Sequence, residues 1–268
     1  MAKMSEQTED KLFSKMIIVG ESGSGKTGSL VSLVKAGYKL RILDMDNNLS
    51  FLRNEIKRED PALLEQVDYI SLRDKVRSDP VKGAVVDGRP KAYTDAIKYM
   101  NKWDDGSKPS ELGPEYIFVV DSLWAFGAAA FNWAKGMNPG TKDPRQWYGT
   151  AQESIRTVLG MLTSDDFKTN LIVITHTVIV ERGEDDVRMF PASIGKSLGP
   201  DIPKFFSTMI MADGEGAGSR RKRFFRTVPT NIMELKNAAP FLIGEKVPLE
   251  TGLIDIFESI KGKEAHDE

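Results

Sequence analysis

The residues best suited to chemistry in this chain stand together near its start, where glycines and serines precede a lysine and a threonine. The run Gly20-Glu21-Ser22-Gly23-Ser24-Gly25-Lys26-Thr27-Gly28 contains the pattern G-x-x-x-x-G-K-[ST]. Glycine allows successive backbone amides to turn inward, which creates a concave site for an anion. In such a loop the Lys26 ammonium binds the β- and γ-phosphates, and the Thr27 hydroxyl binds Mg²⁺. The run therefore predicts a nucleoside triphosphate and Mg²⁺ as ligands.

The stretches on either side of this loop supply the elements that must position it. An apolar run at 16–19 predicts a buried strand, and a helical pattern with Leu30, Leu33 and Val34 on one face follows the loop. The loop thus opens onto a helix N-terminus, whose partial positive charge favours a phosphate. The alternative interpretation is a glycine-rich linker before a helix, and the strand–loop–helix order argues against it.

The whole-chain composition limits the remaining possibilities. With 268 residues, of which 40% are hydrophobic and 28% charged, the chain can bury one substantial core. A net charge of −2 gives no general attraction to nucleic acid, so such binding must come from local patches. The absence of cysteine excludes disulfides, thiolate zinc sites and thiol nucleophiles, and two histidines exclude a histidine-rich metal site. The N-terminus lacks an apolar signal core and no apolar run reaches ~18 residues, so we expect a cytoplasmic protein without membrane contact.

A second informative stretch is the apolar run at 116–120, which is followed by Asp121 and Ser122. Continuous apolar sequence is typical of a strand buried on both faces of a parallel sheet. A carboxylate at the end of such a strand is suited to hold hydrated Mg²⁺ opposite Thr27. The alternative is a buried strand whose last residue happens to be aspartate.

Two other predicted strands also lead to polar residues. The strand at 38–43 leads to Asp46, and the strand at 171–175 leads to His176. Because ligands bind at the carboxyl ends of strands in open α/β sheets, carboxylates placed there, such as Asp46, are candidates for the site. For Asp46 and its neighbour Asn47 the alternative is a cap on the following helix, and position alone does not decide between the two roles.

The rest of the sequence completes the predicted organisation. We expect a loose arm at 1–12, a single domain over 13–262 and a charged tail at 263–268. The interval 73–114 is interpreted as an elaboration between core strands, and 181–200 as a segment that is functional or mobile. Further predicted elements are helices at 91–103, 123–134, 145–162 and 253–260, strands at 66–72 and 232–235, and an antiparallel pair at 205–211 and 223–228.

The order of these elements and three short stretches resemble the RecA-like ATPases. VVDSLWAF at 119–126 resembles the strand that ends in the metal-binding aspartate, and LIVITHTVIV at 171–180 resembles the strand that carries the γ-phosphate sensor. LKNAAPF at 235–241 is similar to the Lys-Asn-Lys segment of the family. The resemblance covers 14–242 and is strongest to the phage RecA-like ATPases of single-strand annealing and recombination. It implies ATP as the nucleotide and an α/β fold, with a mainly parallel central sheet flanked by helices and an antiparallel hairpin extension.

The resemblance also implies roles for individual residues. Asp46 matches the catalytic glutamate, which makes it the general base for the attacking water, although its side chain is one methylene shorter. His176 replaces a glutamine that senses the γ-phosphate, and its protonation would make sensing pH-dependent; the alternative is a strand-end histidine without this role. Lys236 matches a lysine that acts on the γ-phosphate of the neighbouring subunit, and Ala238 stands in place of the second lysine. Together with Lys26 these residues form the predicted catalytic set, which is complete only in a homo-oligomer, a ring or a filament.

Single-stranded DNA is the partner that the resemblance implies. The loop at 131–148 combines cations with aromatic residues, a composition suited to sequence-tolerant binding of single strands. The alternative is that Trp133 and Trp147 pack against the core. The loop at 182–204 also carries cations. The densest basic run, at 220–226, is either a DNA contact or a charged hairpin edge that discourages strand pairing.

Three classes of function follow from these observations. The leading hypothesis is a Mg²⁺-dependent ATPase that acts on single-stranded DNA in recombination, annealing or repair, in the host cytoplasm if a phage encodes it. The second is a nucleotide-switched assembly or loader ATPase without direct DNA binding. The third is a P-loop kinase of a small metabolite, for which the sequence offers no arginine-rich lid.

Overall fold

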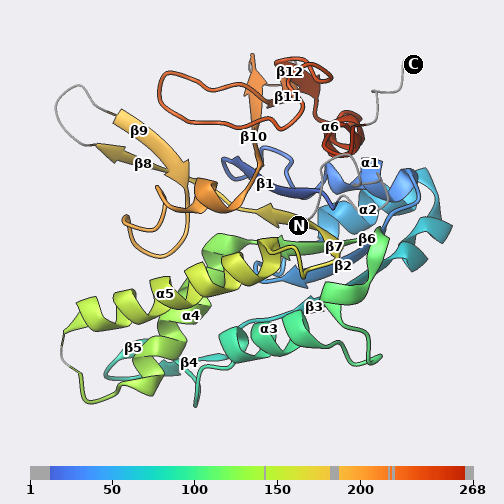
Figure 1. Cartoon of the computed structure of the whole chain (residues 1–268). Coiled ribbons are helices and arrows are strands. Elements are labelled where there is room, and N and C mark those ends of the chain that lie inside the picture. Colours follow the sequence, from blue (N-terminus) through green and yellow to red (C-terminus); the bar gives the residue numbers. More distant parts are fainter. Residues whose placement is uncertain (1–12, 142, 182–186, 217, 219–220, 263–268) are drawn as a thin grey trace, which may run out of the picture.

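The structure is a computed structural model that describes residues 13–141, 143–181, 187–216, 218 and 221–262. Its centre is one eight-stranded sheet with the strand order β12-β11-β10-β1-β7-β6-β2-β3. Helices cover both faces of this sheet (Figure 1). The predicted arm at 1–12 and tail at 263–268 lie outside the described residues.

Six strands of the sheet run parallel. In sheet order they are β10 (Thr208–Glu215), β1 (Lys15–Gly20), β7 (Thr169–Ile174), β6 (Gly113–Asp121), β2 (Lys39–Asp44) and β3 (Val67–Ser71). The apolar runs of five of them, β10, β1, β7, β6 and β2, are buried, whereas β3 at the edge of the sheet is partly exposed. From the β10 edge the sheet continues antiparallel through β11 (Lys222–Arg226) and β12 (Lys246–Pro248). The predicted fold class is therefore confirmed.

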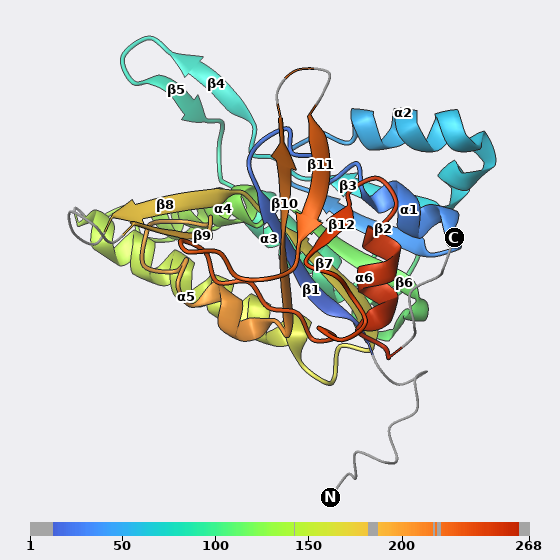
Figure 2. The ribbon, with the colours of Figure 1, turned by 90° about the horizontal axis from the view of Figure 1, so that it is seen from above.

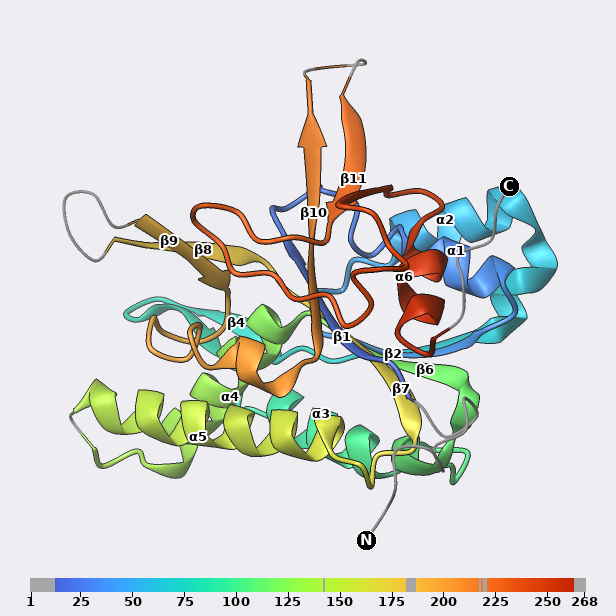
Figure 3. The same cartoon turned by 45° about the horizontal axis from the view of Figure 1, so that its top comes forward.

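Each face of the sheet carries its own core, because successive residues of a strand point to opposite sides. In β1, Met16 and Ile18 face one helical layer, whereas Ile17 and Val19 face the other. Figure 3 shows these layers on opposite sides of the sheet. The first contains α1 (Leu30–Lys35), α2 (Ser50–Glu59), η3 (Pro61–Gln66) and α6 (Leu253–Ser259). The second contains α3 (Ala92–Asn101), α4 (Leu123–Met137), α5 (Pro144–Thr163) and η5 (Ile202–Phe205), and η4 (Pro109–Glu111) joins α3 to β6.

Helical spacing predicted the buried face of α5 correctly. The side chains that α5 buries are Ala151, Ile155, Val158, Leu159 and Leu162. No helix in the described part of the chain has the length and apolarity needed to cross a bilayer.

The predicted strand at 232–235 is wrong. These residues are irregular, although Met233 and Leu235 are buried. The next residue, Lys236, reaches β10 only through an isolated bridge to Met209. From Met211 onward β11 occupies this edge of β10, so the alternating apolar residues fill the core and add no strand.

Two hairpins appear where the sequence suggested irregular segments. β8 (Thr177–Glu181) pairs with β9 (Val187–Pro191) across the start of the interval 181–200. β4 (Val76–Asp79) pairs with β5 (Gly83–Val86) inside the interval 73–114. Figure 2 shows β4 and β5 projecting from the body of the molecule. The helix α3 of the same interval packs into the main core, so the elaboration is anchored at one end and projects at the other.

A buried amide ties together the strand ends opposite the glycine-rich loop. The register between β6 and β7 shifts near the start of β6, which leaves backbone carbonyls outside the regular ladder. The fully buried Asn170 donates to the carbonyl oxygens of Pro114 at 2.7 Å and Tyr116 at 3.0 Å. Its own side-chain oxygen accepts from the backbone N–H of Ser14 at 3.0 Å. Asn170 thus satisfies three backbone groups that the sheet itself leaves unpaired.

Replacing Asn170 by alanine leaves the backbone groups of Ser14, Pro114 and Tyr116 without their side-chain partner, and we expect a loss of about 3 kcal/mol of unfolding free energy in urea. Asn101→Ala is the matched control, because the Asn101 amide donates at an exposed position on α3. The control should change stability by no more than about 0.5 kcal/mol. Equal stability of the two variants would contradict this role of Asn170.

Candidate nucleotide site

The glycine-rich run leaves β1 and curls back over the end of that strand. Gly23 and Gly25 have φ angles of 74° and 99°, which side-chained residues rarely adopt. A Cβ atom on Gly20 would stand 2.6 Å from the carbonyl oxygen of Ala212 in β10. Glycine at these positions therefore allows the tight loop that the sequence pattern predicts.

The side chain of Lys26 is buried inside this loop. Its ammonium donates to the carbonyl oxygens of Gly20 at 2.8 Å and Glu21 at 2.7 Å. Burial lowers the pKa of Lys26 to about 8, although the carboxylates of Asp121, Asp46 and Glu21 act in the opposite direction. Lys26 therefore remains a cation at neutral pH and lies next to the loop backbone.

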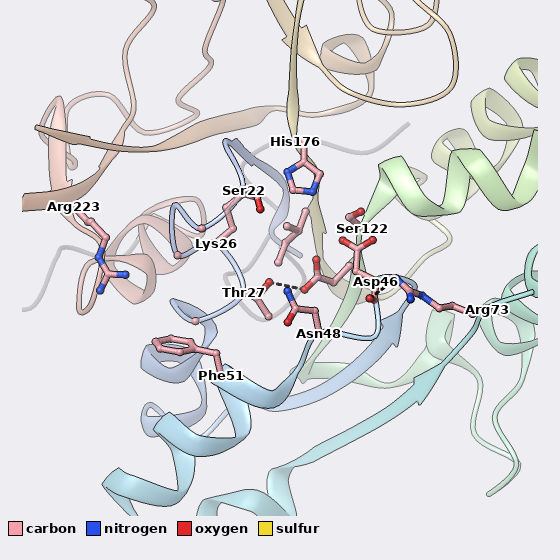
Figure 4. A pocket seen from close by; sticks show the side chains of 15 residues that line it. Ser22, Lys26, Thr27, Asp46, Asn48, Phe51, Arg73, Ser122, His176 and Arg223 are labelled. Atoms are coloured by element: carbon pink, nitrogen blue, oxygen red, sulfur yellow. Dashed lines mark hydrogen bonds between the residues drawn. The ribbon is translucent and has the colours of Figure 1, made fainter. Parts of the chain in front are cut away.

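Asp121 ends β6, and the peptide bond that follows it is cis. Its Oδ2 accepts a hydrogen bond from Thr27 Oγ1 at 2.7 Å (Figure 4). Burial is the main reason that the pKa of Asp121 is raised to about 6, and the carboxylates of Asp46 and Asp44 add to it. The Thr27 hydrogen bond and the Lys26 charge oppose this rise. The two predicted metal ligands thus lie in direct contact.

A pocket of about 490 Å³ opens between the loop and the strand ends. Of the predicted residues it is lined by Ser22, Gly23, Gly25, Lys26, Thr27, Gly28, Asp46, Asp121 and His176. Gly20, Glu21 and Ser24 line a separate cavity on the β10 side of the loop. Most of the predicted nucleotide-binding residues therefore surround one space.

Asp46 lies at the edge of this pocket and does not cap a helix. The helix α2 begins without a side-chain cap, so the capping alternative for Asp46 and Asn47 is wrong. The preceding carboxylate, Asp44, holds the turn: it accepts from the backbone N–H of Asn48 at 3.2 Å and from Ser71 Oγ at 2.8 Å. Because Asp44 performs the structural task, the Asp46 carboxylate can serve the pocket.

His176 follows β7 and lines the pocket beside the loop. Its ring meets the Trp124 ring edge to face, with centroids 6.3 Å apart and planes at 78°. Burial, followed by the charge of Lys26, lowers the pKa of His176 below 6.5, against smaller opposing effects of Asp46 and the Gly20 backbone. The imidazole is therefore neutral at neutral pH, and any pH-dependent behaviour of this residue falls below pH 6.5.

This shift makes stability depend on pH in a defined window. Below 6.5 the unfolded chain binds a proton at His176 that the folded chain resists, so unfolding free energy decreases as pH falls. Well above 6.5 both states are neutral and His176 adds no slope. We predict that the parent loses stability in urea relative to His176→Gln between about pH 6.5 and pH 5. If the unfolding free energies of parent and variant change with pH in parallel across that range, the imidazole of His176 is not buried in its neutral form.

Lys236 does not line this pocket. Its ammonium donates to the carbonyl oxygens of Pro203 and Phe206, each at 2.8 Å. These contacts lie at the end of η5, beside the start of β10, whereas the loop faces the other end of β10. Lys236 therefore makes no contact with the pocket of its own chain, and action on a neighbouring subunit stays a prediction.

Sequence interpretation missed several residues that line the pocket. The Phe51 side chain is 51% exposed, and a Cβ atom on Gly28 would stand 2.5 Å from its ring. The sequence around Phe51 offered no local signal of this contact, because α2 is brought beside the loop only by the folded sheet. Arg73 donates to the backbone carbonyl of Asp46 at 2.7 Å and so supports that turn. The other missed lining residues include Asn48, Ser122 and Arg223.

Some aromatic side chains of the predicted DNA-binding loops pack against other side chains of the protein. Trp133 packs on Tyr93 with ring centroids 4.7 Å apart. Both Trp133 and Trp147 pack against the main core, which supports the packing alternative for both residues. Trp147 packs edge to face on Phe131, and Lys135 lies 5.6 Å over the Trp147 ring. Three of the predicted cations lie outside the described residues, namely Lys142, Arg182 and Arg220.

The oxygen ligands at the strand ends fit Mg²⁺. This ion takes hard oxygen ligands in proteins, commonly one or two carboxylates together with substrate phosphates. The Asp121 carboxylate and the Thr27 hydroxyl provide such ligands next to the loop. Thr27 and Asp121 would therefore hold the metal directly beside the loop that is predicted to bind the phosphates.

Fold and pocket together define a P-loop nucleotide-binding protein. The family model described as AAA domain matches residues 13–238, and the chain belongs to this family. No curated protein matches the sequence.

Solved structures with a similar arrangement share little sequence with this chain. The RadB recombinase is 15% identical with a TM-score of 0.44, over 79% of this chain and 80% of that one. A KaiC-like protein from Pyrococcus horikoshii is 11% identical with a TM-score of 0.40, over 80% and 77%. The flagellar accessory protein FlaH from Methanocaldococcus jannaschii is 12% identical with a TM-score of 0.40, over 80% and 76%. This level of likeness carries no information on substrate or partner.

Proposed function

We propose that this chain is a Mg²⁺-dependent ATPase whose turnover responds to single-stranded DNA. The proposed ATPase activity rests on the 2.7 Å hydrogen bond between Thr27 and Asp121, at a pocket that Lys26 and Asp46 also line. This arrangement combines an anion site, oxygen ligands suited to Mg²⁺ and a carboxylate base.

Each group has a separate task in this mechanism. The backbone amides of 22–28 bind the phosphates. The Lys26 ammonium gives up its hydrogen bonds to the carbonyl oxygens of Gly20 and Glu21 and donates to phosphate oxygens in their place. The Asp46 carboxylate accepts the proton of the attacking water, and the neutral His176 donates a hydrogen bond to the terminal phosphate. Mg²⁺, when bound by the two oxygen ligands, supplies positive charge that offsets the charge on the phosphates.

A series of contacts supports coupling between this pocket and the candidate DNA loops. A cavity next to the phosphate loop is lined by His176, Trp124 and Gly195. A Cβ atom on Gly195 would stand 3.4 Å from the ring of Tyr148, which is 38% exposed at the start of α5. Gln152 of the same helix donates to the backbone carbonyl at 194 and accepts from the hydroxyl at 197. These contacts connect the pocket to the surface loops through adjacent residues, which supports the proposed response to DNA.

Self-association is part of the same proposal, because Lys236 is expected to act on a neighbouring subunit. Five residues beyond it, the Phe241 side chain is 99% exposed, and Leu242 is 37% exposed. Exposed apolar side chains of this kind favour a protein contact. If ATP controls only such contacts, the chain is an assembly ATPase, which is the second candidate function.

ATP turnover with and without a single-stranded oligonucleotide tests the proposal. We expect Mg²⁺-dependent phosphate release that increases with oligonucleotide, and oligonucleotide affinity that falls as salt rises. Asp46→Asn should lower turnover by a factor of about 10² or more and retain ATP affinity, because an amide cannot accept the proton. Tyr148→Ala should weaken oligonucleotide binding about tenfold through lost stacking, whereas Tyr69→Ala, an exposed tyrosine on β3, should not.

The outcomes separate the candidate functions. Turnover that ignores the oligonucleotide, with none bound at low salt, would reject the DNA part of the proposal. ATP-dependent association in that case would identify the assembly ATPase. Transfer of phosphate to a nucleoside or nucleotide acceptor, in place of phosphate release, would identify a kinase.

If Lys236 acts on the neighbouring site, two inactive variants should complement each other. Asp46→Asn still supplies Lys236, and Lys236→Ala still supplies Asp46. Random mixing in equal amounts should restore about a quarter of the sites in a head-to-tail oligomer. The measurement is the turnover of the mixture compared with each variant alone. Because Lys236 also donates to two backbone carbonyls, both variants are first checked for cooperative unfolding. If both variants fold and their mixture shows no recovery of ATP turnover, Lys236 does not act on the neighbouring site.

A further inference from the structure

Arg223 brings a cation of β11 to the nucleotide pocket. Figure 4 shows its side chain on the side of the pocket away from Asp46 and on the same side as Phe51. Arg226, on the same strand, is held by a 3.0 Å ion pair with Asp213 and does not line this pocket. The basic run at 220–226 is therefore not one uniform charged edge, because one of its arginines faces the phosphate loop.

The guanidinium of Arg223 is oriented by Glu250. Both Nε and Nη2 donate to the same carboxylate oxygen, at 3.2 and 2.8 Å. The backbone carbonyl of Arg223 also accepts from the backbone N–H of Leu249 at 3.3 Å. The segment after β12 thus holds the main chain and the side chain of Arg223 together. Because the guanidinium is planar and rigid, this pairing fixes the direction of the third nitrogen, Nη1.

Nη1 lies next to the phosphate loop. It stands 3.3 Å from the position that a Cβ atom on Gly25 would take. Within the described part of the chain, the hydrogen bonds of this guanidinium leave Nη1 without an acceptor. An arginine is permanently charged, and its N–H groups form their strongest hydrogen bonds with anionic oxygens. A donor of this kind beside a glycine of the loop is matched to a phosphate oxygen.

The position of Arg223 along the pocket indicates which phosphate it meets. Asp46 and Asp121 mark the end suited to the metal and the terminal phosphate. Gly28 and the Phe51 ring that lies on it mark the opposite end, towards the nucleoside. Arg223 shares the Phe51 side of the pocket (Figure 4). Its partner is therefore a phosphate on the nucleoside side of the triphosphate.

We propose that Arg223 is a phosphate ligand of the nucleotide bound in its own chain, and that Glu250 is its positioning residue. This inference rests on the proposed nucleotide binding and is independent of any neighbouring subunit. Glu250 lies beyond the residues 13–238 that match the family model. The C-terminal segment of this chain thus completes the nucleotide site by holding an arginine over the loop.

Calorimetric titration with two ligands tests the proposal: Mg²⁺ with a non-hydrolysable ATP analogue, and Mg²⁺ with inorganic tripolyphosphate. Arg223→Gln should weaken both ligands about tenfold, because the lost hydrogen bond is to a phosphate oxygen. Lys222→Gln is the matched control, since it removes the same charge from an exposed neighbour on β11; its affinities should equal those of the parent. Glu250→Gln, introduced into the parent, should weaken the binding of both ligands by a smaller factor. Introduced into Arg223→Gln, it should have no further effect on either affinity.

The alternative outcomes are distinct. Weaker binding of the ATP analogue with unchanged binding of tripolyphosphate would place Arg223 on the base or ribose and overturn the phosphate contact. Unchanged affinity of Arg223→Gln for both ligands would show that Arg223 is not a phosphate ligand and that its ion pair with Glu250 has only a structural role. Tighter binding in Glu250→Gln would mean that Glu250 competes with the phosphate and would overturn its positioning role. A parent that binds neither ligand would reject the nucleotide function itself, and this inference would fall with it.

Discussion

The contact between Thr27 and Asp121 is the constraint on which the rest of the site depends. The two residues belong to the loop after β1 and to the end of β6, and in the sheet these strands are separated by β7. They meet because the loop turns back over the strand ends through glycines with positive φ. The same arrangement leaves His176, at the end of β7, beside the loop and brings Asp46 from the end of the neighbouring β2. Strand order and the turn of the glycine loop together therefore gather these groups at one edge of the sheet.

The charges around this contact explain why one pocket suits both a cation and an anion. Asp44 and Asp121 are register partners on adjacent strands, and Asp46 adds a third carboxylate nearby. Burial and these neighbours raise the pKa of Asp121, while burial lowers the pKa of Lys26. A divalent cation relieves the repulsion among the carboxylates, and phosphates satisfy the lysine and the loop amides. A metal ion and a triphosphate bound together would therefore stabilise each other in this site.

Sequence patterns predicted the parts of this molecule that follow local rules. The glycine loop, the aspartate at the end of β6 and the buried face of α5 depend on glycine conformation and on periodicity, which a single stretch reveals. The alternating residues at 232–235 follow the same local rule and form no strand, because β11 occupies the edge of β10 beside them. Phe51 and Arg223 reach the pocket from α2 and β11, elements that only the folded sheet places beside the loop. Local patterns cannot reveal such neighbours.

The most direct test of the central claim is a crystal structure with a non-hydrolysable ATP analogue and Mn²⁺, recorded at the manganese absorption edge. Mn²⁺ accepts the same oxygen ligands as Mg²⁺, and its anomalous signal locates the ion. We predict a single peak next to both Thr27 Oγ1 and the Asp121 carboxylate, with the phosphates enclosed by residues 22–28. A manganese ion held by other carboxylates, or a triphosphate bound outside the glycine loop, would contradict this account.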